Sequence, residues 1–187
     1  FDGLDTVATV TLDGHVLGET ANQHRRYRFD VTGLVRPGGS ELRIRFRSPV
    51  RYANEQILAL GARPRPYPMP FEAIRKSACN FGWDWGIATF TSGVWRSVRL
   101  EAWSTARIAD ARVAAAAVGD GGVVTAEVSV ARVAGADAAL ELELEVALPD
   151  GGVAVAREAI APGATEASPR VELDAVERWW PAGHGAQ

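Results

Sequence analysis

The chain has 187 residues, of which 47% are hydrophobic and 23% charged, a composition typical of folded globular domains and sufficient for a sizeable core. Its formal net charge is −3, and its 20 basic residues, of which only Lys76 is a lysine, are scattered along the sequence. A nucleic-acid-binding protein concentrates positive charge on one face, so this balance excludes that class of partner.

The first third of the chain has the alternating pattern of β-strands. Residues 8–12 alternate apolar side chains with threonines and are followed by Asp13-Gly14, a dipeptide preferred in two-residue hairpin turns. The same alternation recurs at 27–31 and 42–47. Several short alternating strands joined by turns predict an antiparallel β-sandwich.

The pattern changes after Pro49. Apolar residues recur at helical spacing from Ala53 to Leu60, and Gly61 is a suitable C-terminal cap, so we expect a short helix here. Residues 63–70 contain four prolines, which exclude both a helix and a central strand. We expect this segment to be an irregular loop, and loops of this kind are often functional.

Residues 94–103 return to a strand pattern that is expected to close a first domain. The composition then shifts towards Ala and Val, and alternating apolar runs at 124–130 and 140–148 predict further strands. No helical pattern separates them, which indicates a second sandwich of immunoglobulin-like type. The sequence therefore predicts an all-β protein with two domains, 1–104 and 105–187.

Metal, disulfide and membrane chemistry are not indicated. Cys79 is the only cysteine, and His15, His24 and His184 are too far apart for a local metal-binding motif. No apolar run reaches the roughly 18 residues of a membrane-spanning helix. We therefore expect no metal, no cofactor and no membrane partner. The single cysteine favours the cytoplasm over secretion, in a chain expected to lack its native N-terminus.

The most distinctive segment is NFGWDWG, residues 80–86, which places Asp84 between two indoles close to Arg75. Aromatic faces pack against the C–H face of a sugar ring, while carboxylate and guanidinium groups hydrogen-bond its hydroxyls. Such a set is typical of a sugar-binding surface. Tryptophans of β-sandwiches are equally often core residues, so a purely structural role for these indoles stays open.

Four parts of the sequence resemble the β-mannosidase branch of glycoside hydrolase family 2. They are RKSACNFGWDWG (75–86), GVWRSVRLEAW (93–103), FDGLDT (1–6) and WWPAGHGAQ (179–187). The resemblance implies a galactose-binding-like jelly-roll sandwich that lacks its first strands, followed by an immunoglobulin-like sandwich that lacks its C-terminal end. Many members carry a proline after the last glycine of the tryptophan motif, where this chain has Ile87.

By that resemblance the chain is the non-catalytic front portion of an exo-acting β-mannosidase, which hydrolyses terminal non-reducing β-D-mannose residues. The family carries both catalytic carboxylates on a separate (β/α)8 barrel, so no catalytic residue is expected here and the chain alone should be inactive. The implied partners are a β-mannoside substrate and the barrel of the same parent chain.

Carried over to this sequence, the resemblance implies the substrate-binding residues Asp84, Trp83, Trp85, Arg75 and Asn80. Asp84 would accept hydrogen bonds from mannose hydroxyls, and Arg75 would bind a hydroxyl or orient Asp84. One indole would stack on the sugar and the other would support the aspartate. In an extended segment the two indoles would point to opposite sides. Asn80 is a secondary candidate, with hydrogen bonding inside the loop as its alternative role.

Two other features have open assignments. Lys76 is expected to be exposed to solvent. Trp179-Trp180-Pro181 resembles the segment through which the second domain contacts the barrel, and a buried strand end is its alternative.

Two alternative functions also remain. The chain could be a free-standing carbohydrate-binding module that uses the same aromatic and carboxylate surface. It could also belong to another family 2 glycosidase, a galactosidase or a glucuronidase, because the motif at 1–6 recurs among those enzymes.

Overall fold

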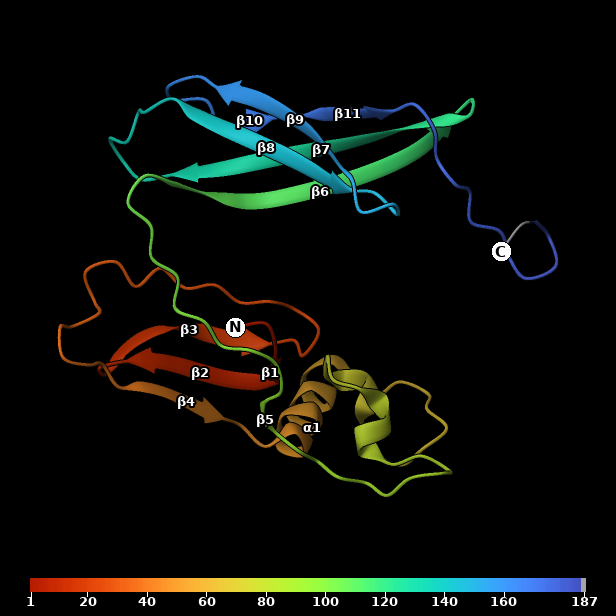
Figure 1. Ribbon diagram of the computed structural model, residues 1–187. Coiled ribbons are helices and arrows are strands. Elements are labelled where there is room, and N and C mark those ends of the chain that lie inside the picture. Colours follow the sequence, from red (N-terminus) through yellow and green to blue (C-terminus); the bar gives the residue numbers. More distant parts are fainter. Residues whose placement is uncertain (186–187) are drawn as a thin grey trace. The chain divides into compact units, whose positions relative to one another are not determined.

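A computed structural model describes residues 1–185 (Figure 1). The chain divides into two compact units, Phe1–Leu100 and the residues from Glu101 onward. The first unit combines five short strands with the single α-helix of the described residues and two short 3-10 helices, and the regular elements described in the second unit are all strands. The predicted all-β class is confirmed. The predicted domain boundary after residue 104 stays a prediction, and the last two residues of the predicted second domain, 186 and 187, lie outside the described residues.

The first unit contains two small antiparallel sheets. In the larger sheet β2 (Val7–Leu12) is central, between β3 (His15–Ala21) and β4 (Leu42–Phe46). In the smaller sheet β1 (Leu4–Asp5) pairs with β5 (Gly93–Val94), so the beginning of the unit lies beside its end. These strands follow the predicted alternation, since the apolar side chains of β2 are buried and its threonines at 9 and 11 are half-buried.

The β2–β3 hairpin turn has the conformation that its sequence predicts. Asp13 has a φ of 48° and Gly14 a φ of 83°, the two positive values of a type I′ turn. The Asp13 carboxylate also accepts a hydrogen bond of 2.7 Å from the backbone N–H of Glu41, just before β4. This bond from the backbone holds the pKa of Asp13 below its ordinary value, because it stabilises the ionised form.

The predicted helix is confirmed as α1 (Pro49–Leu60). Its N-cap is Ser48, whose hydroxyl accepts a hydrogen bond from a backbone N–H of the first turn, and Pro49 occupies the position where a helix tolerates proline best. It ends at Gly61, which has a φ of 89° and donates its N–H to the Ile57 carbonyl over 2.9 Å.

The helix packs on one side of a small core. Ala53 is fully buried in a cluster with Val7, Ile74 and Phe81. Two short 3-10 helices, η1 (Phe71–Ala73) and η2 (Ala78–Phe81), bring the last two of these residues into contact with the helix and with β2. Figure 1 shows this yellow-green segment beside α1. The core therefore fixes the chain just before Trp83.

One of the predicted strands is absent and another is reduced to a short stretch. Residues 27–31 form no strand. Tyr27 and Phe1 exchange main-chain bonds of 2.9 and 3.0 Å, and the Val31 carbonyl accepts a bond of 2.9 Å from the Leu34 N–H, which belongs to a turn and not to a ladder. Of the predicted strand 94–103 only β5 is regular, and its pairing continues through separate bonds such as Asp2 N–H to the Ser97 carbonyl, 2.9 Å. A strand requires a continuous ladder, which alternation alone does not supply.

The second unit is a sandwich of a four-stranded and a two-stranded antiparallel sheet. In the larger one β7 pairs with β6, β10 and β11, and in the smaller one β8 pairs with β9. Their bounds are β6 Ala106–Val118, β7 Gly121–Arg132, β8 Leu140–Ala147, β9 Val153–Ile160, β10 Glu166–Ala167 and β11 Arg170–Leu173. The predicted run at 124–130 thus lies in β7. The run at 140–148 lies in β8, except for its last residue, which follows that strand.

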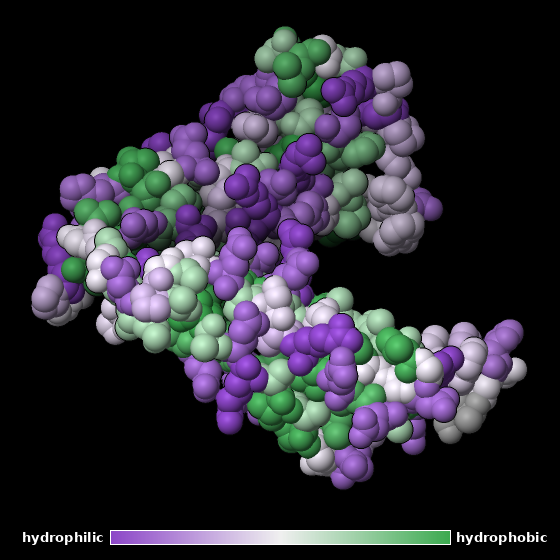
Figure 2. All heavy atoms as spheres, turned by 90° about the horizontal axis from the view of Figure 1, so that it is seen from above, coloured by the Kyte–Doolittle hydropathy of each residue, from purple (hydrophilic) through white to green (hydrophobic). Residues whose placement is uncertain are grey.

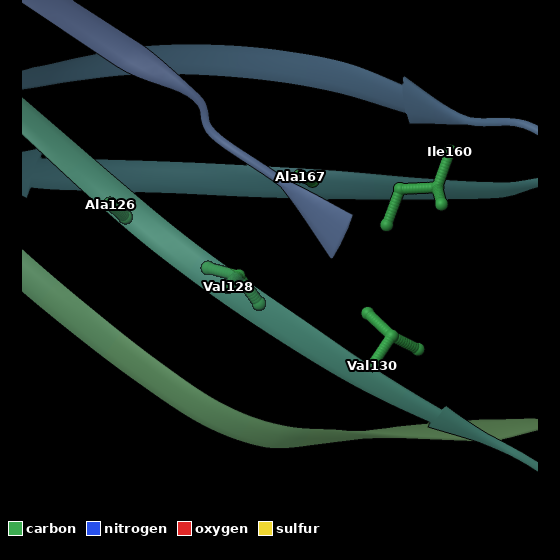
Figure 3. Packing of buried hydrophobic residues seen from close by; sticks show 5 residues of the cluster. All are labelled: Ala126, Val128, Val130, Ile160 and Ala167. Atoms are coloured by element: carbon green, nitrogen blue, oxygen red, sulfur yellow. The ribbon is translucent and has the colours of Figure 1, made fainter. Parts of the chain in front are cut away.

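The core of the second unit lies between its two sheets. Val128 and Val130 of β7 are buried with Ile160 of β9, together with two alanines (Figure 3). Leucines from the inward face of β8 pack against them, while Glu141, Glu143 and Glu145 face solvent. The glutamates therefore form the solvated face that their alternation predicts.

Candidate functional site

The tryptophan motif forms a tight turn. Trp83 and Gly86 exchange two backbone hydrogen bonds of 3.1 and 3.2 Å, which leaves Asp84 and Trp85 at the tip. Neither tip residue has a positive φ, so the turn needs no proline or glycine at the tip. We call residues 83–86 the aromatic turn. Ile87, which stands where many resembling proteins carry a proline, follows the turn and is exposed.

The two indoles of the aromatic turn lie on the same side of the chain. The ring centroids of Trp83 and Trp85 are 5.0 Å apart. Trp83 also contacts Tyr67, with ring centroids 5.4 Å apart. The indoles were expected on opposite sides only in an extended segment, and the segment is not extended. A turn brings residues i and i+2 together.

The side chains of the aromatic turn differ in exposure. Trp85 is 76% exposed, Asp84 is also exposed, and Trp83 is half-buried between Tyr67 and Trp85. An indole this exposed presents an apolar face to water, which is unfavourable unless a ligand or another surface covers it. Trp83 is therefore held inside the row of rings and Trp85 projects into solvent, while the substrate-binding role of either indole stays a prediction.

Arg75 lies at the start of the segment and is exposed. Its carbonyl accepts a hydrogen bond of 2.9 Å from the backbone N–H of Gln23, which ties this part of the loop to the end of β3. Across residues 1–185 no ion pair joins Arg75 to Asp84. Direct orientation of Asp84 by Arg75 has no support here, and binding of a hydroxyl by Arg75 stays a prediction.

The expectation that Lys76 is solvent-exposed is wrong. Lys76 is 5% exposed, and its ammonium group forms an ion pair with Asp5, which is also 5% exposed. The second carboxylate oxygen of Asp5 accepts a hydrogen bond from the Thr6 hydroxyl. Lys76, the only lysine of the chain, therefore connects the segment that leads into the aromatic turn to β1. Asp5, in the motif at 1–6, supplies the opposite charge.

Asn80 contributes to the internal hydrogen bonds of the loop. Its side-chain amide donates to the Thr91 hydroxyl over 3.3 Å, and its backbone carbonyl accepts from the Thr89 N–H over 3.1 Å. These bonds connect the two arms on either side of the aromatic turn. The alternative role, hydrogen bonding inside the loop, is the one that the structure displays.

A half-buried ion pair holds the proline loop, residues 63–70. Arg65 donates from Nη1 to Oε1 of Glu72 over 2.7 Å and from Nη2 to the Pro68 carbonyl over 3.1 Å. Burial raises the pKa of Glu72, but hydrogen bonds from its own backbone N–H and from Arg65 outweigh burial and hold the pKa below the ordinary value of 4.5. The neighbouring Arg63 acts in the same direction.

Glu72→Gln is expected to lower the free energy of unfolding at neutral pH but not in acid. Because the folded-state pKa is lowered, ionised Glu72 stabilises the fold above pH 4.5, and this contribution is lost as the pH falls through the folded-state pKa. Urea unfolding of both proteins at pH 7 and at stepwise lower pH values measures the difference. A difference that does not change with pH would contradict the assignment.

The second unit carries other surface features but none of the candidate residues. Trp179 is 83% exposed and Trp180 is 43% exposed, outside any strand, so the alternative of a buried strand end is wrong. Figure 2 shows that hydrophobic residues in green lie among hydrophilic ones on the face in view. Two open grooves, of about 390 and 200 Å³, lie along β7 and β11.

Residues 1–185 contain no group of three or more His, Cys, Asp or Glu side chains placed to hold a metal ion. Within the same range no helix has both the length and the apolar character needed to cross a bilayer.

Sequence reasoning missed several residues around the aromatic turn. Tyr67, Arg65 and Asp5 were not among the candidates, although the proline loop and the motif at 1–6 were both singled out. The signal for Tyr67 was an aromatic residue inside a loop that leads into the motif. The pairing of Asp5 with Lys76 had no local signal, because 71 residues separate them.

A profile of the "Glycosyl hydrolase 2 galactose-binding domain-like" family matches residues 1–96. The chain belongs to this family. The matched region is a non-catalytic domain of glycoside hydrolase family 2, and it contains both the aromatic turn and its supports. The predicted resemblance to the family is confirmed.

The relatives of this family member include several β-mannosidases. A β-mannosidase of Capra hircus is 42% identical over 113 residues, which are 56% of this chain and 13% of that protein. β-Mannosidase B of Aspergillus oryzae is 35% identical over 195 residues, 99% of this chain and 22% of that protein. The chain therefore spans less than a quarter of the length of the curated relatives it matches.

A solved structure matches nearly the whole chain. The β-D-mannosidase of Dictyoglomus thermophilum superimposes with a TM-score of 0.79 at 25% identity, over 98% of this chain and 23% of the other. The fold of nearly the whole chain therefore has a counterpart in a known structure.

Proposed function

We propose that the chain is the non-catalytic front portion of an exo-acting β-mannosidase, a hydrolase of terminal non-reducing β-D-mannose residues. The proposal is supported by the names of relatives that match 99% of the chain and by the structural match over 98% of it. In it, the aromatic turn forms part of the wall around the terminal mannose. The substrate is a β-mannoside, and the catalytic barrel of the same parent chain is the partner.

The observation that carries this role is the exposed Asp84 at the tip of the turn beside the exposed face of Trp85. The carboxylate has no ion-pair partner within residues 1–185, so its oxygens are available to sugar hydroxyls. Charge-assisted hydrogen bonds of this kind contribute roughly 1.5 to 3 kcal/mol each. The indole offers the flat apolar face on which a pyranose packs.

The openness of the turn favours a wall of a larger site over a complete site. Ligand pockets bury most of the ligand surface, and a projecting turn covers a sugar from one direction only. In the proposed enzyme the barrel supplies the remaining walls and both catalytic carboxylates. Glu72 is held by Arg65 and is unsuited to pair with Asp84 as a second catalytic carboxylate.

Asp84→Ala in the full-length enzyme is expected to lower kcat/KM on an aryl β-mannoside at least about tenfold, because a hydroxyl in a closed site loses a charged acceptor. Initial-rate kinetics measure the effect. Asp137→Ala is the matched control, since Asp137 is another exposed aspartate and lies in the second unit. Equal kcat/KM for wild type and Asp84→Ala would remove Asp84 from the site.

Binding and specificity measurements separate the alternatives. Isothermal titration of residues 1–187 with mannobiose or mannan should give no measurable heat of binding, whereas a free-standing carbohydrate-binding module would bind without the barrel. Aryl β-galactoside and β-glucuronide should be poorer substrates of the full-length enzyme than the aryl β-mannoside. The opposite order would assign the chain to another branch of the family.

A further inference from the structure

Three aromatic rings connect the proline loop to the exposed indole. Tyr67 contacts Trp83 with ring centroids 5.4 Å apart and an interplanar angle of 39°, and Trp83 contacts Trp85 at 5.0 Å and 49°. Trp85 is the outermost ring of this row. Its position therefore depends on Trp83, and the position of Trp83 depends on Tyr67.

Tyr67 lies in a segment without regular secondary structure, so hydrogen bonds of a ladder or helix do not fix it. Instead Arg65 makes two bonds that bracket Tyr67 in sequence. One goes to Glu72, after the loop, and the other goes to the carbonyl of Pro68, the residue that follows Tyr67. A planar guanidinium with fixed donor directions suits such a two-point contact.

Glu72 is itself fixed to the core of the first unit. It occupies the middle of η1, and its neighbours Phe71 and Ala73 pack against the cluster that contains Ala53 and Phe81. The side chains of Arg65 and Glu72 are 24% and 16% exposed, and Oε2 of Glu72 is buried without a hydrogen-bond partner. Because Oε2 has no partner, the bond from Arg65 to Oε1 and the Glu72 backbone N–H together compensate for burying this charge.

Another Arg–Glu pair of the same unit lacks these properties. Arg43 and Glu41 are joined over 2.8 Å, close to the 2.7 Å of Arg65 and Glu72, but their side chains are 70% and 66% exposed. Exposed ion pairs contribute little, because solvent screens them and both side chains lose conformational freedom. The pair Arg43–Glu41 therefore serves as a control for the pair Arg65–Glu72, since it joins the same two residue types at the exposed surface.

We propose that Arg65 and Glu72 are positioning residues for the sugar-binding wall, acting through Tyr67 and Trp83 on Trp85 and Asp84. The ion pair holds the proline loop on the core, the loop holds Tyr67, and the row of rings fixes the aromatic turn. This inference rests on the proposed function for its catalytic consequence. Its structural consequence, a displaced Trp85 when the pair is broken, is independent of any substrate.

The kinetic test is Arg65→Met in the full-length enzyme. A displaced wall weakens binding of ground state and transition state alike, so KM on the aryl β-mannoside should rise about threefold to tenfold with kcat unchanged. Loss of folded protein alone would lower the apparent kcat and leave KM unchanged. Arg43→Met should alter neither value. Arg65→Lys, which retains a charge but not the two-point contact, should fall between wild type and Arg65→Met.

The route through the rings is tested by a double-mutant cycle. Tyr67→Ala removes the contact to Trp83 without touching the ion pair, and should raise KM to a similar extent. The double variant Arg65→Met/Tyr67→Ala should then be no worse than either single variant, because both break the same connection. Additive effects would contradict a route through Tyr67. Tyr67→Ala also keeps the inference testable if Arg65→Met fails to fold.

The structural readout is ¹⁹F NMR of the full-length protein labelled with 5-fluorotryptophan. The Trp85 resonance is assigned by its loss in Trp85→Phe. It should shift in Arg65→Met, Glu72→Gln and Tyr67→Ala, and stay in place in Arg43→Met, because stacked rings alter each other's local field. An unchanged Trp85 resonance in Arg65→Met and Tyr67→Ala would overturn the inference, whatever Asp84→Ala does to activity. Unchanged kinetics in Asp84→Ala with a shifted resonance would reject the proposed function and retain the positioning role.

Discussion

Lys76→Met is expected to lower the free energy of unfolding by about 3 to 5 kcal/mol, which is the effect of removing one partner of a buried ion pair. Lys76 and Asp5 are each 5% exposed, so the substitution leaves the Asp5 carboxylate buried beside an apolar side chain. The Thr6 hydroxyl alone then compensates the charge. Urea unfolding of the chain, followed by tryptophan fluorescence, measures the loss from the unfolding midpoint and slope.

The double variant Asp5→Asn/Lys76→Met is the decisive comparison. Removing both charges avoids an unpaired buried ion, so the double variant should be more stable than Lys76→Met alone. Arg43→Met breaks an exposed pair and should change the unfolding midpoint far less. A midpoint for Lys76→Met as close to wild type as that of Arg43→Met would show that the buried pair does not hold the loop.

Phe81→Ala is the second large effect, with an expected loss of about 3 to 5 kcal/mol from a cavity in the core. Phe81 is 3% exposed and packs with Val7, Ala53 and Ile74, where β2, α1 and the loop before the aromatic turn meet. Its ring also contacts Phe90 edge-on, with centroids 5.5 Å apart. Thermal unfolding followed by circular dichroism should show a drop of at least about 10 °C for a unit of this size.

Phe90→Ala is the matched control for Phe81→Ala. It removes the same side chain from the other member of the ring pair, but Phe90 is 38% exposed and leaves a smaller cavity. Its effect on the unfolding temperature should be clearly smaller. Equal shifts for the two variants would mean that the contact between the rings, and not burial of Phe81 in the core, carries the stability.

The regular elements were largely predictable because their signals are local. Asp13-Gly14 predicts its own turn, since both residues accept the positive φ that a type I′ turn requires. The helix ending at Gly61 and the strand at β8 followed in the same way from spacing and alternation. The strands predicted at 27–31 and 94–103 failed because alternation does not reveal whether a neighbouring chain supplies a continuous ladder.

The site was predictable in its composition but not in its arrangement. Sequence identified Trp83, Asp84 and Trp85 as a set suited to sugar binding, and their roles as substrate-binding residues stay predictions. It placed the indoles on opposite sides of an extended segment, although side chains two residues apart lie on the same face of an extended backbone. Two hydrogen bonds between Trp83 and Gly86 turn the chain instead, and the rings meet.

The sequence by itself determined the all-β class, the hairpin, the capped helix and the family, because each depends on short-range spacing or on a contiguous motif. Only the tertiary structure decided that Lys76 is buried on Asp5 and that Arg65 holds the loop behind the tryptophans. Lys76 and Asp5 are 71 residues apart, and burial is a property of the folded surroundings of a side chain. From sequence alone a charged residue in a polar loop is predicted to be exposed, because charged side chains are seldom buried unpaired. The fold can bury it by placing a residue of opposite charge beside it.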